Sequence, residues 1–447
     1  MNSTKTAGMK AFRADILHLL GDPGATLDHE TSEQIEYIED GLLVIKAGLV
    51  TELGAAKTLL KTLPADCEVI EYPNQLIIPG MIDTHVHYPQ SDMIASYGEQ
   101  LLTWLETYTF PTESQFSDPA HAKDVAGFFL DELLRNGTTT ALVFGTVHPE
   151  SIDAFFEEAQ QRNLRMIAGK VLMDRNCPDY LQDTPESAYA DSKALIEKWH
   201  GKDRLLYAVT PRFAPTSTNE QLAKAGQLLE EFPDVYLHTH VAENKDEVAW
   251  VRELFPESRS YLDVYHEYKL LRSRSVLAHC IHLDDEDKQC MVETGAAAAF
   301  CPTSNLFMGS GLFDYKDLKQ HGVRVGLGTD VGGGNSFSLL ETSSEAYKVT
   351  QMLGKKLSAF QQLYLATLSG AKALYLDDEI GNFEVGKEAD FAVLNFAGTP
   401  LIKRRAKHCN DLHEKLFSLM MLGDDRAISA TYVLGEIAHC KSSYGGN

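Results

Sequence analysis

Short apolar runs rich in β-branched and aromatic residues recur along the chain. Most are separated by segments in which apolar residues recur three and four positions apart, the period of an amphipathic helix. Eight runs are predicted as strands, at residues 76–85, 139–145, 166–173, 205–210, 235–241, 275–279, 297–300 and 323–328. Strands that alternate with helices favour a parallel sheet, because each helix returns the chain to the same end of the sheet.

The clearest helical segments are residues 120–136, which end before Gly137, and residues 219–232, which precede Pro233. Eight strand–helix units predict an α/β fold, a closed (β/α)8 barrel of the TIM type. A doubly wound open sheet is the alternative. No G-x-G-x-x-G follows an early strand, so the dinucleotide-binding form of that alternative has no support.

Short β-like pieces flank the barrel at both ends of the chain, at residues 41–50, 389–396, 430–433 and 436–439. A small β-sandwich domain formed from both termini is therefore predicted. We expect residues 1–78 to form its N-terminal part, residues 79–385 the catalytic barrel, and residues 386–447 its C-terminal part.

Composition narrows the class of partner. The 447 residues include 64 acidic and 40 basic side chains, a net charge of −24. That balance argues against nucleic acid or an anionic membrane, because phosphates favour clustered Lys and Arg. Seven cysteines without a C-x-x-C pair are typical of a reducing compartment. No apolar run approaches the ~18 residues of a membrane span, and Arg13 and Asp15 interrupt any signal-like stretch. A cytoplasmic protein is expected.

Metal-capable side chains follow several of the predicted strands. In a barrel, the carboxyl ends of the strands meet at one rim, where the active site lies. His85 and His87 are two apart on a strand and therefore share a face, so both imidazoles can reach one ion. His240 and Asp330 would complete a site of three histidines and one carboxylate, ligands that suit zinc. His238 competes with His240, and Fe²⁺ or Mn²⁺ could occupy the same ligands.

Three of these strand ends also carry candidate acid–base groups. A metal ion lowers the pKa of a bound water to roughly 7 and so provides hydroxide at neutral pH. Asp330 can accept the proton of that water, or it caps the Gly-rich turn that follows it. Glu243 can carry protons to a substrate, or it opens a helix as an exposed residue. His279 can bond to the attacking hydroxide, or it is a core histidine beside Cys280.

Other polar and aromatic residues are candidates for reading a flat substrate. Arg212 offers a planar fork of donors, Phe213 a stacking face, and Gln90 both a donor and an acceptor. Each is more often structural than functional when considered alone. Trp104 lies in an apolar segment and is expected in the core rather than in a lid.

Two other catalytic designs lack their motifs. The H-x-E deaminase motif has a partial match at residues 148–150, but the P-C-x-x-C that must follow is absent. The G-x-S-x-G turn of serine hydrolases is absent as well.

The chain resembles the amidohydrolase superfamily in PGMIDTHVH at 79–87, in Gly-Thr-Asp at 328–330 and in GKEAD at 386–390. Within that superfamily it is similar to the guanine deaminase family over essentially the whole chain, apart from the first forty residues and the last few. The similar stretches are HYPQSDMIASYGEQLLTWLETYTFPTE from 87, NGTTTALVFGTVHP from 136, TPRFAPTS from 210, HTHVAENKDEVAWV from 238, AFCPTSNLFMGSGLF from 299 and GLGTDVGGG from 326.

The resemblance implies a role for each matching residue. One zinc ion would be held by His85, His87, His240 and Asp330, since Thr-Pro-Arg follows the fourth run where two-metal members carry a carbamylated lysine. Glu243, His279 and Asp330 would be catalytic. The substrate would contact His87, Gln90, Arg212, Phe213, His240, Glu243 and Asp330. The implied reaction is hydrolysis of guanine to xanthine and ammonia in purine catabolism, by a homodimer.

Two alternatives stay open. The substrate could be another ring amine or related compound, such as a pterin, 8-oxoguanine, adenine or a chlorinated triazine, because the metal site does not discriminate among them. The barrel could instead have lost catalysis and serve as a scaffold. The presence of all four candidate ligands and of Glu243 argues against the scaffold.

Overall fold

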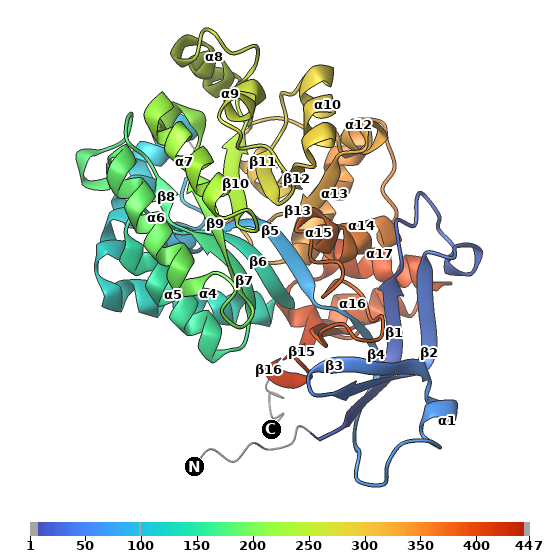
Figure 1. The fold of residues 1–447 in the computed structure, drawn as a ribbon. Coiled ribbons are helices and arrows are strands. Elements are labelled where there is room, and N and C mark those ends of the chain that lie inside the picture. The colour runs from blue at the N-terminus through green and yellow to red at the C-terminus, as the bar shows by residue number, and fades with distance from the viewer. Residues whose placement is uncertain (1–7, 98–99, 442–447) are drawn as a thin grey trace, which may run out of the picture.

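The structure is a computed structural model that describes residues 8–97 and 100–441. A barrel with surrounding helices forms one part, and strands from both ends of the chain form a second sheet beside it (Figure 1). Residues 1–7 and 442–447, the outer ends of the two predicted terminal segments, lie outside the described residues. No helix among the described residues is long and apolar enough to cross a membrane.

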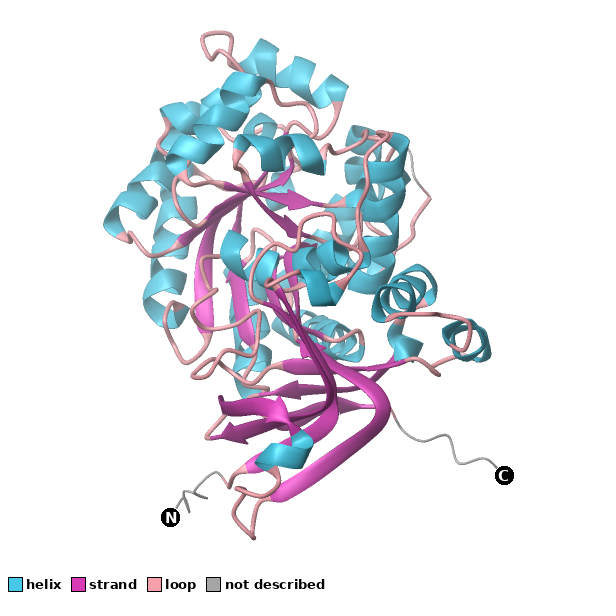
Figure 2. Cartoon of the chain, turned by 90° about the vertical axis from the view of Figure 1, so that its right-hand side faces the viewer, coloured by secondary structure: helices cyan, strands magenta, loops and turns pink. Residues whose placement is uncertain are grey.

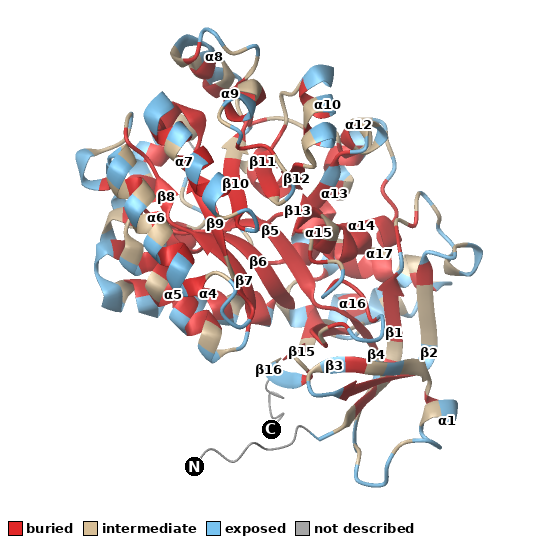
Figure 3. Ribbon diagram, in the orientation of Figure 1, coloured by how far each residue is buried: buried red, intermediate tan, exposed pale blue. Residues whose placement is uncertain are grey.

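The barrel strands follow one another around the sheet in their order along the chain. They are β5 (Met81–His87), β6 (Thr138–Phe144), β7 (Arg165–Gly169), β9 (Leu205–Pro211), β10 (Tyr236–Val241), β11 (Ser275–His279), β12 (Ala297–Phe300) and β13 (Arg324–Leu327). The pairs between them are parallel, and the two-residue strand β8 (Val171–Leu172) also pairs with β9. This arrangement confirms the predicted (β/α)8 barrel, and Figure 3 shows its strands buried almost throughout.

The ring is closed where the last barrel strand returns beside the first. The carbonyl of His85 accepts the N–H of Asp330 at 2.9 Å. The buried carboxylate of Asp83 accepts both the hydroxyl and the N–H of Thr329, the latter at 3.1 Å. Burial raises the pKa of Asp83 to about 7. The hydroxyl of Thr84 donates to the carbonyl of Leu327 at 3.0 Å. Side chains of β5 thus hold the segment that carries Asp330.

Helices pack around the barrel. They are α4 (Pro119–Arg135), α5 (Pro149–Gln161), α6 (Pro185–Trp199), α7 (Asn219–Glu231), α8 (Lys245–Leu254), α9 (Tyr261–Glu267), α10 (Asp285–Thr294), α12 (Tyr315–His321), α13 (Leu339–Met352), α14 (Ala359–Ala366) and α15 (Leu368–Ala373). Most of them are amphipathic, but the last two, residues 359–366 and 368–373, are almost fully buried. The two predicted helices correspond to α4 and α7. Asp118 caps α4 through the N–H of Ala120, and Gly137, with φ of 79°, follows its end.

The first predicted strand, residues 76–85, is divided between two strands in the structure. Its beginning belongs to β4 (Glu68–Pro79) of the terminal sheet, and the barrel strand starts only at Met81. Both strands are buried at the junction, so the apolar pattern continues across the break. Gly80 makes the junction, where a Cβ would lie 2.0 Å from the Thr139 hydroxyl oxygen. The third run is likewise divided, between β7 and β8.

The terminal sheet has the order β16-β15-β14-β4-β1-β2-β3. Besides β4 it contains β1 (Lys10–Leu19), β2 (Ile35–Lys46), β3 (Leu49–Ala55), β14 (Phe391–Asn395), β15 (Ile428–Val433) and β16 (Glu436–Cys440). The antiparallel pair of β4 with β14 joins the two ends of the chain, and Figure 2 shows the long strands bending. Aromatic contacts between Phe12, Phe391 and Tyr432 fill its core. The small β domain from both termini is therefore confirmed. Strand β1 was not predicted from the sequence.

Two helices of the C-terminal region leave this sheet and pack on the barrel. They are α16 (Pro400–Ala406) and α17 (Leu412–Leu422). Phe417 of α17 meets Tyr347 of α13 with ring centroids 4.9 Å apart, and His413 lies 5.5 Å from Phe360 of α14.

We expect Thr329→Val to destabilise the metal-loaded protein by about 1–3 kcal/mol, because the buried Asp83 carboxylate loses one donor while the side chain keeps its shape. The free energy of unfolding in urea measures the effect. Thr58→Val, at an exposed threonine of the short helix α1 (Ala56–Leu59), is the control and should change it by less than about 0.5 kcal/mol. Equal effects of the two substitutions would contradict the importance of the contact.

Candidate active site

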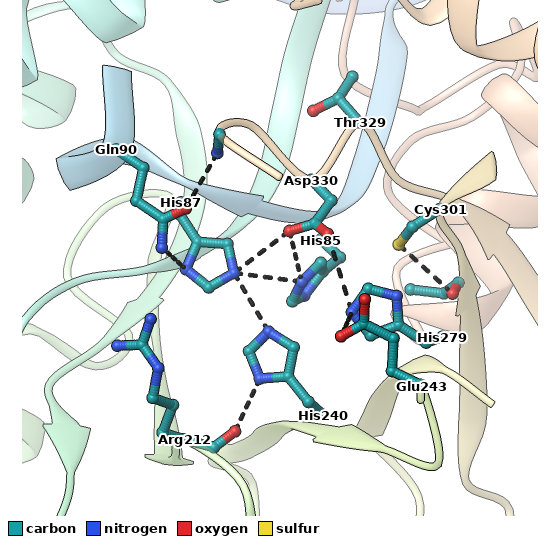
Figure 4. A network of polar contacts seen from close by, with 12 residues as sticks. His85, His87, Gln90, Arg212, His240, Glu243, His279, Cys301, Thr329 and Asp330 are labelled. Atoms are coloured by element: carbon teal, nitrogen blue, oxygen red, sulfur yellow. Dashed lines mark hydrogen bonds and ion pairs between the residues drawn. The ribbon is translucent and has the colours of Figure 1, made fainter. Parts of the chain in front are cut away.

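The four predicted metal ligands meet at the carboxyl end of the barrel. His85 and His87 come from β5, His240 from β10, and Asp330 follows β13 (Figure 4). One ligand atom from each lies within 4.8 Å of all the others. The structure thus gathers residues from opposite ends of the barrel sequence into one group.

The distances within the group fit a single ion. Nε2 of His87 lies 3.3 Å from Nε2 of His85 and 3.2 Å from Nε2 of His240. Oδ1 of Asp330 lies 3.1 Å from His85 and 3.3 Å from His87. A tetrahedral ion with ligands at 2.0–2.1 Å separates its ligand atoms by roughly 3.3 Å. Facing nitrogen lone pairs repel each other without a cation between them, so these residues form a site for a divalent metal ion.

Hydrogen bonds to the second ring nitrogens orient two of the imidazoles. Nδ1 of His240 donates to the carbonyl of Arg212 at 2.7 Å, which leaves Nε2 free for a metal. Nδ1 of His85 lies 2.7 Å from Nε2 of His238. His238 therefore lies behind the ligand His85 and is not one of the four metal-binding residues. The sequence alone had left it as a competitor of His240. Burial lowers the pKa of His85 to about 4, so the ring is neutral, as a ligand must be.

Asp330 is held as a carboxylate despite its burial. Burial acts to raise its pKa, but the imidazoles beside it, His85 first among them, bring that pKa well below its ordinary value. Asp330 has a φ of 51°, and His279 and Ala242 have φ of 72° and 50°. Non-glycine residues rarely adopt this region, and such strained positions cluster at functional sites.

Glu243 and His279 lie beside the metal ligands. Oε2 of Glu243 is 3.4 Å from Nε2 of His279, and the same nitrogen is 3.7 Å from Oδ2 of Asp330. Burial raises the pKa of Glu243. Burial lowers the pKa of His279, but the two neighbouring carboxylates outweigh it and raise that pKa. Glu243, predicted to carry protons, and His279, predicted to bond to the attacking hydroxide, therefore both lie against the metal group.

A cavity opens above this group at the rim. Every residue predicted to contact a substrate lines it, namely His87, Gln90, Arg212, Phe213, His240, Glu243 and Asp330. Its apolar wall contains Leu101, Trp104, Leu105 and Met308. Trp104 belongs to the hydrophobic cluster there, as expected, and is also part of the cavity wall. The cavity thus joins an apolar side to a polar side, a lining suited to a heterocycle with polar edges.

One buried carboxylate of the site was missed by the sequence analysis. Glu113, at the end of the short helix α3 (Phe110–Glu113), receives both terminal nitrogens of Arg212, at 2.7 and 3.1 Å. It also accepts from Nε2 of Gln90 at 3.1 Å. The only signal in the sequence is its place at the end of the family-like stretch from residue 87.

Three further side chains support the proton-moving residues. Asn305 of α11 (Pro302–Phe307) accepts from Nδ1 of His279 at 2.8 Å, and Ser310 donates to Glu243 at 2.7 Å. Glu247 accepts the backbone N–H of Glu243 at 2.9 Å and belongs to the capping box that opens α8. The Asn-x-x-Glu spacing at 244–247 is a recognisable signal. The contacts of Asn305 and Ser310 depend on how the short helix α11 and the loop after it are placed, which no local pattern indicates.

The barrel, the metal-ligand group at its rim and the cavity beside that group are the features of a metal-dependent enzyme. Comparison with known proteins agrees with this class. The model of the amidohydrolase family matches residues 76–438, so the chain belongs to that family. Guanine deaminase of Escherichia coli (strain K12) is 53% identical over 433 residues, 96% of this chain and 98% of that protein.

Solved structures show the same relationship. An E. coli guanine deaminase structure covers 97% of this chain and 100% of its own, with a TM-score of 0.93 and 53% identity. A guanine deaminase from C. acetobutylicum, with guanine bound in its active site, has a TM-score of 0.86 and 30% identity and covers 96% of this chain and 100% of its own.

We expect the purified protein to carry one divalent ion per chain, and His240→Ala to lower that content severalfold because it removes one of the four ligands. Elemental analysis of the dialysed protein measures it. His266→Ala, at an exposed histidine of α9, should leave the content unchanged. Retention of a full equivalent by the His240 variant would contradict the assignment of the ligands.

Proposed function

We propose that this protein hydrolyses guanine to xanthine and ammonia, as an enzyme of purine catabolism. The observation that carries the proposal is the cavity, in which a metal-binding group and a carboxylate face an apolar wall and a planar set of donors. The guanine deaminases that share its sequence and fold support guanine as the substrate.

We propose zinc as the ion, held by His85, His87, His240 and Asp330. Three imidazoles and one carboxylate form a donor set that zinc favours. Bound there, the ion supplies the Lewis acidity that activates water at neutral pH.

The chain's own residues would carry the protons. Asp330 accepts the proton of the attacking water, and the water oxygen adds to C2 of guanine, the carbon that bears the exocyclic amine. Glu243 delivers a proton to the ring nitrogen beside C2, and His279 donates a hydrogen bond to the attacking oxygen. The proton accepted by Asp330 passes to the exocyclic amine, the C2–N bond breaks and ammonia leaves. The hydroxyl proton at C2 returns to Glu243, and xanthine remains. The contacts of His279 with Glu243 and with Asp330, and the burial that raises the pKa of Glu243, support these roles.

Recognition of the purine would fall to the polar side of the cavity and its apolar wall. Arg212 presents donors to a carbonyl oxygen, and Gln90, whose Oε1 accepts the N–H of Gly332 at 3.1 Å, fixes one edge of the ring. Phe213, which packs with Trp250 at 6.3 Å between centroids, offers the stacking face.

The finer expectations about organisation stay proposals of the same kind. We propose a cytoplasmic homodimer, supported by seven free cysteines and by the family resemblance. We also propose the division into residues 1–78, 79–385 and 386–447, supported by the end of β4 at Pro79 and the start of β14 at Phe391. Helix α17 belongs to residues 386–447 and packs on the barrel, so this last part of the chain contacts both proposed domains.

We expect Glu243→Gln to keep its metal and lose about 10²–10⁴-fold in kcat for ammonia release from guanine, because the amide cannot transfer the proton. Ammonia release with parallel metal analysis measures this. Asp246→Asn, at an exposed position in the first turn of α8, should have near-normal activity. Full activity of the Glu243 variant with metal bound would exclude the proton-transfer role.

We expect guanine to exceed adenine and cytosine in kcat/KM by roughly 10⁴-fold or more, since buried donors that lose their acceptor discriminate strongly against the ligand lacking it. A panel of these bases assayed for ammonia release decides the point. Comparable turnover of adenine would instead favour a broader ring-amine hydrolase, and no turnover of any base by metal-loaded protein would favour the scaffold.

A further inference from the structure

An ion pair is buried in the wall of the cavity. The side chains of Glu113 and Arg212 are 1% and 3% exposed, and the guanidinium meets the carboxylate through two of its nitrogens. A guanidinium is charged at every relevant pH. Its burial beside a cavity needs compensation, and Glu113 is the carboxylate that bonds to it among the described residues.

The same carboxylate determines how Gln90 is turned. Glu113 only accepts hydrogen bonds when ionised, so the side of Gln90 that faces it at 3.1 Å must be the amide nitrogen. The other side of the amide accepts the N–H of Gly332. Nε2 of Gln90 also lies 3.2 Å from Nδ1 of His87. Glu113 is therefore one carboxylate that contacts both polar residues proposed to read the purine, Arg212 and Gln90.

Glu113 reaches the cavity from a segment outside the barrel strands. Helix α2 (Leu101–Trp104), a π-helical turn (Leu105–Thr109) and α3 run in succession and supply the apolar wall before they place Glu113 against Arg212. π-helical turns are rare and frequent at functional sites. The ring of Phe110 lies 5.4 Å from the guanidinium carbon and adds a second contact from the same segment.

We propose that Glu113 is a positioning residue that makes this cavity selective for a neutral heterocycle over its anion. Paired with Glu113, Arg212 offers directed donors but no net charge. Without Glu113 the cavity would hold an uncompensated cation and would favour anionic rings, including the anion of xanthine. The inference rests on the proposed function, because it concerns recognition at the same site.

The test is the binding of xanthine to the metal-loaded protein in mildly acidic and in alkaline buffer, where xanthine is neutral and anionic respectively. Calorimetry gives the ratio of the two affinities. For Glu113→Gln we expect that ratio to shift by about tenfold or more toward the anion, since a unit charge close to the ligand is removed. The kcat/KM for guanine should fall as well, because the donors of Arg212 and Gln90 lose their orientation.

Two further variants separate charge from packing. Glu113→Asp keeps the charge and should retain the wild-type ratio while kcat/KM falls. Glu158→Gln removes the partner of Arg162, an ion pair of α5 at 2.5 Å outside the cavity, and should change neither value. If Glu113→Gln fails to fold, Arg212→Gln leaves the Glu113 carboxylate without its partner and should shift the ratio in the opposite direction, toward neutral xanthine; an unchanged ratio there would overturn the inference as well.

An unchanged affinity ratio in Glu113→Gln would overturn the inference, as would an equal shift in Glu113→Asp. Activity of the wild-type protein on guanine is measured separately. An active wild type with an unaltered ratio in the variant would refute the role of Glu113 alone, whereas an inactive wild type would refute the proposed function.

Discussion

The closure of the barrel between β5 and β13 is the contact on which the rest of the site depends. Asp83 binds Thr329, and the backbone of His85 binds that of Asp330. Through this contact the first and last strands meet, and the ligand that follows β13 comes within reach of the two histidines of β5. An open sheet would leave the same residues on opposite edges. The metal-binding group is therefore a consequence of ring closure as much as of the ligands themselves.

Burial then determines what the gathered groups can do. It keeps His85 neutral and available as a ligand, while Asp330 stays ionised because the ligands around it favour its charge. The same low-polarity surroundings require each charge at the cavity to have a partner. His279 lies between two carboxylates, and Arg212 is paired with Glu113. The metal-binding group, His279 and Arg212 are thus linked by the same requirement, that each charge buried at the rim has a partner.

Much of this arrangement could be predicted from the chain, because ligands and strands are local patterns. The two-residue spacing of His85 and His87 and the apolar runs before each polar strand end indicated both the barrel and its metal site. The strand break at Gly80 was not predicted, since buried strands on either side continue one apolar pattern, although the predicted domain boundary after residue 78 lies beside it. Glu113, Asn305 and Ser310 were also missed. They lie in short helices or loops, where no periodicity indicates which way a side chain points.

What the sequence determined by itself was the fold class, the metal-ligand types and the family, because each depends on residue identity at short, regular spacing. Only the tertiary structure decided that His238 lies behind His85, that Trp104 belongs to both core and cavity wall, and that Glu113 pairs with Arg212. These outcomes depend on how segments distant in sequence pack across the barrel rim. The free energy that selects them comes from burial and charge pairing between residues whose proximity exists only in the folded chain.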